Sequence, residues 1–277
     1  MNHSHETAPT QFANAGGVRY AYRRFGKSGN APLLFLGYFN SNMDGWDPQV
    51  TNSFAADHEV ILFNNAGIAS SGGDTPSTVP KMTEHCVAFC RALGLDVIIP
   101  VGFSLGGMIA QQLALDHPQL VKRIILLGTG PRGGEGMTFT ELSPEEQADP
   151  ISFLMAAFFT ASDASIAAGK AYRERLEFRK EDRDPPVSRE SAVAQLSAIR
   201  EWGTIPSSDR YATLKNIKHH TLIVHGNKDI VVAPINGLIL AEYLPDAQLI
   251  VYPDSSHGAQ YQHADLFLKH AKMFLSE

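Results

Sequence analysis

Hydrophobic residues along this chain gather in short dense runs separated by longer amphipathic stretches. The short runs predict strands at residues 18–25, 31–37, 59–65, 96–102, 123–128, 220–226 and 247–253. Apolar positions at helical spacing predict helices at residues 79–93, 105–117, 233–243 and 264–275. Several strand runs are continuously apolar, which is typical of parallel strands covered on both faces. The alternation therefore predicts an α/β fold with a doubly wound, mostly parallel sheet.

One long stretch interrupts this alternation. From residue 135 to residue 215 the pattern is helical throughout, apart from a charged break, KEDRDPP, at 180–186. We interpret it as a helical cap inserted into a core that consists of residues 1–134 and 216–277. Such a cap should lie over the carboxyl edge of the sheet, where open α/β sheets bind ligands.

Composition and charge argue against two classes of binding partner, nucleic acids and membranes. The chain has 277 residues, of which 44% are hydrophobic, so it can bury one large core. Its net charge is −6 and it has no cluster of Lys and Arg, so we expect no nucleic-acid partner. The apolar runs are far shorter than the roughly 20 residues of a membrane helix, so we expect no membrane partner either.

The N-terminus and the cysteines indicate the compartment. The N-terminal stretch MNHSHETAPTQF lacks the basic start and the apolar core of a secretory signal, and we interpret it as a short loose tail. Cys86 and Cys90 are the only cysteines and fall four residues apart on a predicted helix, a poor fit to disulfide geometry. They predict buried free thiols and a cytoplasmic location.

Two glycine-rich turns compete as the site of the chemistry. Residues 128–133, GTGPRG, formally match the GxGxxG turn that holds a dinucleotide. That turn must open a helix directly, so that the pyrophosphate meets the helix N-terminus. Here the glycine-rich continuation predicts a loop instead, and the polar stretch SPEEQADP stands where a second strand should end in an acidic residue. We interpret the match as accidental and expect no nucleotide cofactor.

The other turn, in VIIPVGFSLGG, lies where a nucleophile would be presented. Gly102-Phe103-Ser104-Leu105-Gly106 is a GxSxG sequence that follows a predicted buried strand and opens a predicted amphipathic helix. This is the setting of a nucleophile elbow, a sharp turn that lifts the serine above the sheet edge and leaves no room for a Cβ at the glycines. Pro100, inside the strand, should cost one ladder hydrogen bond.

A nucleophilic serine needs a base and a group that orients the base. His257, in VYPDSSHGAQ, occupies the loop after the last predicted strand, where the base of such a sheet is expected. The acid should follow the preceding strand, and LIVHGNKDIVV supplies Asp229. Asp254, three residues before His257, is the alternative acid but suits a local turn better, and His225 is expected to brace the loop.

These placements carry a resemblance to a known family. The segments LFLGYFNSNMDGWDP, VILFNNAGIASSG, VGFSLGGMIAQQLALDHPQLVKRIILLGTGP, VHGNKD and SSHG resemble the α/β-hydrolase superfamily, in particular small capped bacterial hydrolases that include cofactor-free haloperoxidase-like esterases. The resemblance implies Ser104 as nucleophile, His257 as general base and Asp229 as the acid that orients it. It implies no cofactor, and no HExxH motif or other ligand cluster suggests a metal.

The resemblance also implies an oxyanion hole, and here the chain departs from many relatives. Its donors would be the backbone N–H of Leu105 and one that follows the first long strand. Where many relatives carry His-Gly this chain has Gly37-Tyr38, so the N–H of Phe39 is the expected second donor. The candidate pocket residues are Tyr38, Asn40, Phe158 and Trp202, although aromatic residues at helical spacing more often belong to a core.

The resulting hypothesis is cleavage of a small-molecule carboxylic ester or lactone through an acyl-enzyme on Ser104. Perhydrolysis, with peroxide in place of water, would use the same three residues. Hydrolysis of a carbon–carbon bond is disfavoured because relatives of that type tend to place tryptophan after the histidine, where this chain has Gly258. Epoxide hydrolysis and dehalogenation need an aspartate in place of Ser104. A non-catalytic ligand receptor is the remaining alternative.

Overall fold

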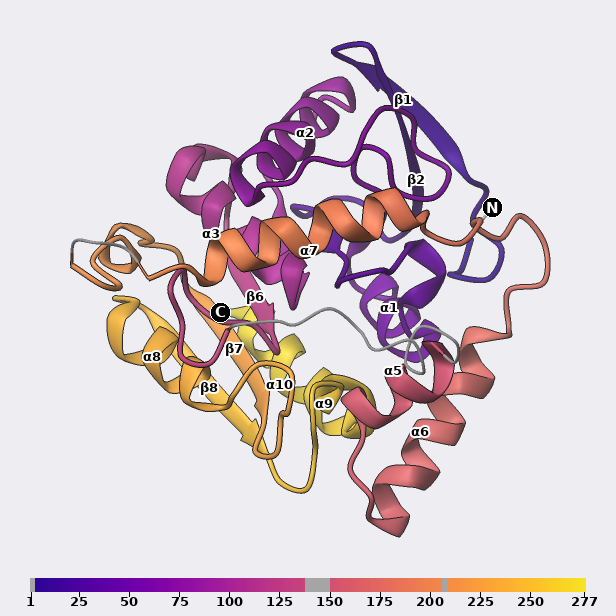
Figure 1. Ribbon diagram of the computed structural model, residues 1–277. Helices are drawn as coiled ribbons and strands as arrows, with labels where there is room; N and C mark the ends of the chain where they lie inside the picture. The colour runs from indigo at the N-terminus through magenta and orange to yellow at the C-terminus, as the bar shows by residue number, and fades with distance from the viewer. Residues whose placement is uncertain (1–2, 138–149, 206–208) are drawn as a thin grey trace.

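One eight-stranded sheet organises the chain (Figure 1). The computed structural model describes residues 3–137, 150–205 and 209–277. The strand order is β1-β2-β4-β3-β5-β6-β7-β8; β2 is antiparallel to both of its neighbours, and all other pairs are parallel. The strands are β1 (Gln11–Ala15), β2 (Val18–Gly26), β3 (Leu33–Leu36), β4 (Glu59–Phe63), β5 (Ile99–Phe103), β6 (Ile124–Leu127), β7 (Thr221–Gly226) and β8 (Ala247–Tyr252). The predicted α/β class and mostly parallel sheet are confirmed.

Helices cover both faces of this sheet because its strands are apolar on both sides. The α-helices in the described residues are α1 (Pro48–Ala55), α2 (Val79–Ala92), α3 (Leu105–Asp116), α5 (Pro150–Phe158), α6 (Asp163–Leu176), α7 (Arg189–Gly203), α8 (Ile235–Tyr243), α9 (Ala259–Gln262) and α10 (Ala264–Ser276). Along β3, Leu34 and Leu36 pack into a core with α2, α3 and α8, whereas Leu33 and Phe35 pack into a second core with α1 and α10. This two-sided burial explains the continuous apolar runs of the strands.

Pro100 is the second residue of β5, and the register around it explains why proline is tolerated there. Ile98 bridges Val121 on the β6 side, and the next pair on that side is Val101 with Ile125. The register between the two segments therefore slips by one residue across this interval. A proline, which has no N–H to donate, fits at such an irregularity. On the other side of β5, Pro100 pairs with Leu34 of β3.

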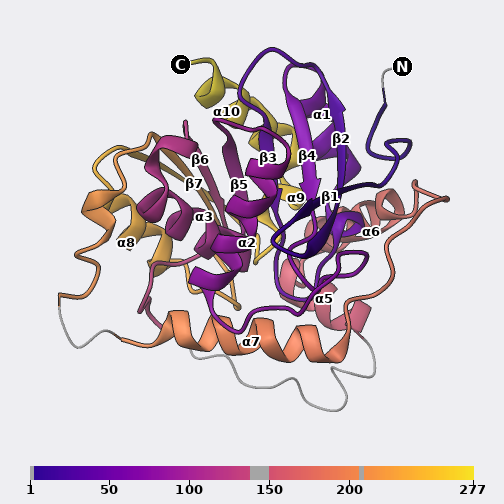
Figure 2. The ribbon, with the colours of Figure 1, turned by 90° about the horizontal axis from the view of Figure 1, so that it is seen from above.

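Helices α5, α6 and α7 follow β6 and precede β7 in the sequence. In Figure 2, α7 runs across one end of the sheet, with α5 and α6 beside it. This is the carboxyl end of the parallel strands, because the indole N–H of Trp202 in α7 donates to the carbonyl of Gly130, just past β6. The predicted cap boundaries stay a prediction, since residues 138–149 and 206–208 lie outside the described residues.

The N-terminal segment is not the loose tail that its composition suggested. His5 is 2% exposed and Ala8 is fully buried, and residues 11–15 form β1, which the hydrophobic pattern missed. The guanidinium of Arg179, from the loop after α6, donates hydrogen bonds to the carbonyl oxygens of His5, Glu6 and Ala8. Backbone hydrogen bonds and a distant arginine order this segment, and neither leaves a hydrophobic pattern in the sequence.

The structure also bears on the two cysteines and on a possible membrane span. Cys86 and Cys90 are buried, free thiols, as predicted. Within the described residues, no helix combines the length and the apolar character needed to cross a bilayer.

Candidate active site

Ser104 stands at a strained turn between β5 and α3. Its backbone has φ 53° and ψ −114°, a conformation that residues with a side chain rarely adopt. The turn closes so tightly that a Cβ on Gly106 would lie 1.8 Å from the carbonyl oxygen of Leu36, and one on Gly102 would lie 2.4 Å from that of Gly106. Both glycines of the GxSxG sequence are therefore required by backbone packing.

The second glycine-rich turn supports the first. The N–H of Ser104 donates to the carbonyl of Leu127 at 2.9 Å, and the hydroxyl of Thr129 donates to the carbonyl of Ser104 at 2.8 Å. The stretch GTGPRG is a loop, as predicted, and Thr129 in it holds the serine turn from the neighbouring strand end. Its glycines lie in the loop by which the chain leaves the sheet after β6, and no helix begins there.

His257 and Asp229 meet at the same edge of the sheet. The Nδ1 of His257 lies 2.8 Å from Oδ2 of Asp229, and both side chains are buried. The imidazole packs against the rings of Phe103 and Phe158, at centroid distances of 4.9 and 5.8 Å. Its backbone N–H donates to the carbonyl of Ala157, so the end of α5 helps to position the histidine.

Asp229 is ionised although it is buried. Burial opposes the charge, but the positive field of His257 and hydrogen bonds from His225 and His257 outweigh it and hold the pKa of Asp229 well below its usual range. Its Oδ1 also accepts the N–H groups of Val231 and Val232, at 2.8 and 2.9 Å. Nε2 of His225 lies 3.4 Å from Oδ2 and 2.9 Å from the carbonyl of Val232, so this imidazole braces the loop.

Asp254, the alternative acid, lies elsewhere. Its carboxylate accepts the hydroxyls of Thr160 and Ser162 and an ammonium N–H of Lys228. These contacts hold a turn in which Asp254 itself has φ 46°. The structure therefore brings Asp229, and not Asp254, to His257.

Ser104 and His257 share one cavity of about 110 Å³. Its wall is almost entirely apolar, and α5 and α7 supply much of it. The candidate pocket residues Tyr38 and Phe158 line this cavity, and so does Phe39, the expected oxyanion donor. The remaining lining residues are Phe153, Leu154, Ala157, Leu196, Ile199 and Val231. The helical spacing of those in α5 and α7 indicated an apolar helix face, but it could not indicate whether that face would line a cavity or pack in a core.

Two predicted pocket residues are not part of this wall. The side chain of Asn40 is exposed, and its backbone N–H donates to Oε1 of Gln195 in α7 at 2.8 Å. Trp202 is 2% exposed and belongs to the core around α3, with its indole bonded to Gly130 and the guanidinium of Arg132 over its ring. The prediction of both as pocket residues is wrong, and for Trp202 the core interpretation holds.

The two expected oxyanion donors belong to Leu105, which follows Ser104 at the start of α3, and to Phe39, which lines the Ser104 cavity. The N–H of Leu105 belongs to the first turn of α3, where N–H groups have no partner within the helix. The N–H groups of Asn40 and Ser41 are engaged by Gln195 and by the carbonyl of Tyr38. The neighbouring N–H of Phe39 has no acceptor within residues 3–137, 150–205 and 209–277.

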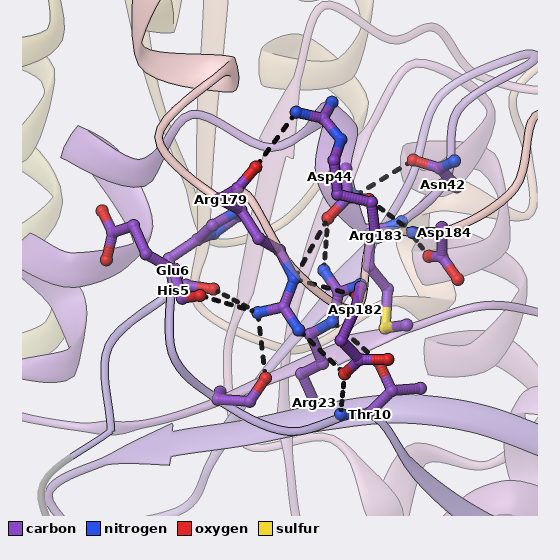
Figure 3. Close-up of polar contacts among 12 residues, drawn as sticks. His5, Glu6, Thr10, Arg23, Asn42, Asp44, Arg179, Asp182, Arg183 and Asp184 are labelled. Carbon is purple, nitrogen blue, oxygen red and sulfur yellow. Dashed lines mark hydrogen bonds and ion pairs between the residues drawn. The ribbon is translucent and has the colours of Figure 1, made fainter.

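A buried ionic cluster, which no pattern in the sequence indicates, surrounds Asp44 in the turn Met43–Gly45. Arg23, fully buried in β2, donates to the carboxylate of Asp44. Asp44 also accepts the N–H of Asp184, whose own carboxylate accepts the N–H of Met43 at 3.2 Å. Figure 3 shows these groups converging with Arg179 from three distant parts of the chain.

Within the described part of the chain, no group of three or more His, Cys, Asp and Glu side chains is arranged to hold a metal ion. The buried polar groups beside the cavity instead form the Ser104, His257 and Asp229 arrangement. Chemically, this arrangement can activate a hydroxyl by passing its proton to an oriented imidazole.

Comparisons with known proteins identify the fold family. The family described as alpha/beta hydrolase fold matches residues 31–264. The alpha/beta hydrolase fold protein from Chitinophaga pinensis is 35% identical, with a TM-score of 0.88 over 99% of both chains. Est816, described as an N-acyl homoserine lactone degrading enzyme, is 28% identical with a TM-score of 0.72, over 95% of this chain and 100% of that one. The 2-hydroxymuconate semialdehyde hydrolase of Pseudomonas putida is 27% identical over 212 residues, 76% of this chain and 74% of that protein.

Proposed function

Because this chain belongs to the alpha/beta hydrolase family, we propose that it is a serine hydrolase that cleaves a small-molecule carboxylic ester or lactone through an acyl-enzyme on Ser104. The observation that carries the proposal is the convergence of Ser104 and His257 on one apolar cavity, with ionised Asp229 on Nδ1 of His257. A serine at a strained turn, an oriented imidazole and a buried carboxylate are the parts that acyl transfer requires.

The proposed mechanism uses each of these groups in turn. Asp229 holds His257 so that Nε2 is the basic nitrogen, and Nε2 removes the hydroxyl proton as Oγ of Ser104 attacks the carbonyl carbon. The oxyanion forms against the N–H groups of Phe39 and Leu105, each worth about 3–4 kcal/mol of barrier. His257 then protonates the leaving alcohol oxygen. A water molecule, deprotonated by His257, releases the acid and restores Ser104.

The cavity wall supports a neutral, largely apolar substrate. Its lining contains no Lys or Arg within the described residues, so an anionic substrate would be desolvated without a counter-charge. The walls from α5 and α7 support the interpretation of residues 135–215 as a cap that sets specificity.

Carbon–carbon bond hydrolysis is the second candidate, and the likeness to the 2-hydroxymuconate semialdehyde hydrolase favours it. The name of that substrate describes an anion, which the apolar lining here does not match. Gly258 also stands where tryptophan is expected in enzymes of that type. Perhydrolysis would share every step with the ester reaction, with peroxide replacing water on the acyl-enzyme.

The first experiment is labelling with a fluorophosphonate probe followed by peptide mass spectrometry. We expect one adduct, on Ser104, which is lost in His257→Ala and retained in the control His263→Ala. His263 is a suitable control because its Nε2 donates to the carbonyl oxygen of Pro253 at 2.9 Å, and it does not line the cavity. A folded protein that is not labelled would contradict the proposal and favour the ligand receptor.

Turnover assays then separate the candidate reactions. The wild-type enzyme, once its Ser104 has been shown to react with the probe, is assayed with three kinds of substrate. These are neutral esters and lactones, 2-hydroxymuconate semialdehyde, and an ester with added peroxide. The proposal expects turnover of the neutral esters or lactones. Turnover of the semialdehyde alone would replace it with carbon–carbon bond hydrolysis.

A further inference from the structure

A second, smaller cavity of about 30 Å³ shares a wall residue, Tyr38, with the Ser104 cavity. Tyr38 contributes to both walls, and Leu105, one of the proposed oxyanion donors, lines the smaller one. Unlike the larger cavity, the smaller one has many polar side chains in its wall. They are Ser41, Asn42, Asn64, Asn65, Thr75 and Gln195.

Most of these polar groups are already satisfied by the protein. The amide of Asn64 donates to Asp184 and its oxygen accepts the N–H of Met43. The hydroxyl of Ser41 donates to the carbonyl of Tyr38. The amides of Asn42 and Asn65 and the hydroxyl of Thr75 likewise have protein partners.

Gln195 is the exception. It is 5% exposed, and its amide group faces the backbone N–H of Asn40 at 2.8 Å. Because a backbone N–H can only donate, the facing atom must be the oxygen Oε1, which leaves the NH₂ group as the other end. Nε2 has no acceptor in the described part of the chain. Gln195 lines the smaller cavity, and its NH₂ group is not among the fully occluded polar atoms of the described residues, so this donor is open to an acceptor supplied by a ligand.

The position of His257 decides which part of the substrate reaches this donor. His257 lines the larger cavity and, in the proposed mechanism, protonates the leaving alcohol. The alcohol part must therefore lie in the larger, apolar cavity. The acyl part then extends past Tyr38 and Leu105 towards the smaller cavity. A volume of about 30 Å³ admits only a few atoms, since a single water needs about 10–15 Å³ of the same measure.

We propose that Gln195 is a specificity-determining residue whose Nε2 donates a hydrogen bond to a neutral acceptor oxygen in a short acyl group. The inference rests on the proposed function, and it names the substrate class as esters or lactones with an apolar alcohol part and a short, oxygen-bearing acyl part. An anionic acyl group is disfavoured, because the lining has no cationic side chain and the amide of Asn64 in this wall already donates to the carboxylate of Asp184. Through Oε1, the same side chain holds the turn that contains Phe39.

The test compares two esters that differ by one atom. Hexyl methoxyacetate has an ether oxygen where hexyl butanoate has a methylene. The ratio of their kcat/KM values is measured for the wild type and for Gln195→Glu, which keeps an acceptor for Asn40 but loses the donor. The difference in intrinsic reactivity of the two esters cancels between the proteins. We expect the ratio to fall by about fivefold to tenfold in Gln195→Glu, the value of one hydrogen bond, while hydrolysis of the butanoate persists.

Two further variants complete the design. The exposed Gln119→Glu introduces the same charge far from the site and should leave the ratio unchanged. Gln195→Met loses both ends of the amide, so it should lose the preference for the methoxyacetate and also turn over both esters more slowly. Thermal unfolding of each variant verifies that it is folded.

An unchanged ratio in Gln195→Glu overturns the inference. Failure of the proposed function looks different, because Ser104 would then resist the fluorophosphonate in the wild type as well. If Ser104 is labelled but neither ester is turned over, the ratio is measured instead from the protection that each ester gives against labelling. Equal protection by the two esters in wild type and variant would equally reject a role for Nε2.

Discussion

At the scale of single residues, the site depends on a carboxylate that is buried and yet charged. Asp229 keeps its charge because two N–H groups of Val231 and Val232 and the two imidazoles around it stabilise the ionised form more than burial destabilises it. A buried anion with this many donors has one fixed orientation. In the proposed mechanism it transmits that orientation to His257.

The contribution of this carboxylate can be measured with two isosteric variants. Asp229→Asn keeps the shape but replaces the anion, so His257 should lose its correct tautomer and kcat should fall by about 10³–10⁴-fold. Asp254→Asn makes the same chemical change three residues before His257, in a turn where Asn tolerates the positive φ, and should stay within a factor of two or so of wild type. Ester hydrolysis under saturating substrate is the assay. Equal losses in the two variants would contradict the assignment of Asp229.

At the scale of elements, the strand–turn–helix unit of β5 and α3 sets the position of Ser104. The turn is strained, and it persists because α3 packs its first residues directly on the backbone of β3. The loop after β6 adds the hydroxyl of Thr129 to the carbonyl of Ser104. Three neighbouring strand ends therefore cooperate to hold one side chain.

Gly106 tests how close this packing is. In Gly106→Ala the added methyl would overlap the carbonyl of Leu36, so the helix must move away from the sheet. We expect the free energy of unfolding in urea to fall by about 3 kcal/mol or more, together with loss of labelling at Ser104. Gly72→Ala is the matched control, since its Cβ would have no neighbour closer than 3.7 Å. Equal stability of the two variants would show that the turn can relax.

At the scale of the whole molecule, one buried ionic cluster joins segments that are far apart in the sequence. Arg23 of the sheet and Arg179 of the helical region meet at Asp44 (Figure 3). Arg179 also donates to three carbonyl oxygens of the N-terminal segment around His5. Hydrogen bonds and ion pairs of these two arginines thereby connect the N-terminal segment, the sheet and the helical region.

His5 makes this connection sensitive to pH. Burial, as the largest cause, lowers its pKa from 6.5 to about 4, so the folded protein keeps it neutral. Above pH 6.5 neither state binds the proton; between pH 6.5 and about 4 only the unfolded state does, so stability is lost as the pH falls. The loss from this group should reach about 2 kcal/mol at pH 5.

The measurement is urea unfolding at pH 7 and pH 5. His58 and His85, whose pKa values burial also lowers, contribute in the same direction, so the result is the difference between the wild type and His5→Gln. The variant should lose less stability than the wild type on acidification, and the control His3→Gln should behave as the wild type. A pH dependence unchanged by His5→Gln would refute the assignment.

The order of strands and helices, the class of fold and the glycine turn around Ser104 could all be predicted from the sequence. Each is a local property, since the spacing of apolar residues defines which side of an element is buried, and a GxSxG turn needs its glycines for backbone reasons. The order of Ser104, Asp229 and His257 could be predicted as well, because parallel strands bring their carboxyl ends to one edge. Their catalytic roles stay predictions, to be tested by the labelling and the variants above.

Only the tertiary structure decided whether an apolar side chain faces the core or a cavity, and which distant group a polar side chain contacts. The pattern could not show that Trp202 turns to the core while Phe153 and Leu196 turn to the cavity, because both environments are equally apolar. Nor could it show that residues 3–10 are held by Arg179, or that Gln195 offers one end of its amide to Asn40 and the other to a second cavity. Hydrogen bonds and ion pairs between residues more than a hundred positions apart leave no periodicity in the chain, so they emerge only when the elements pack.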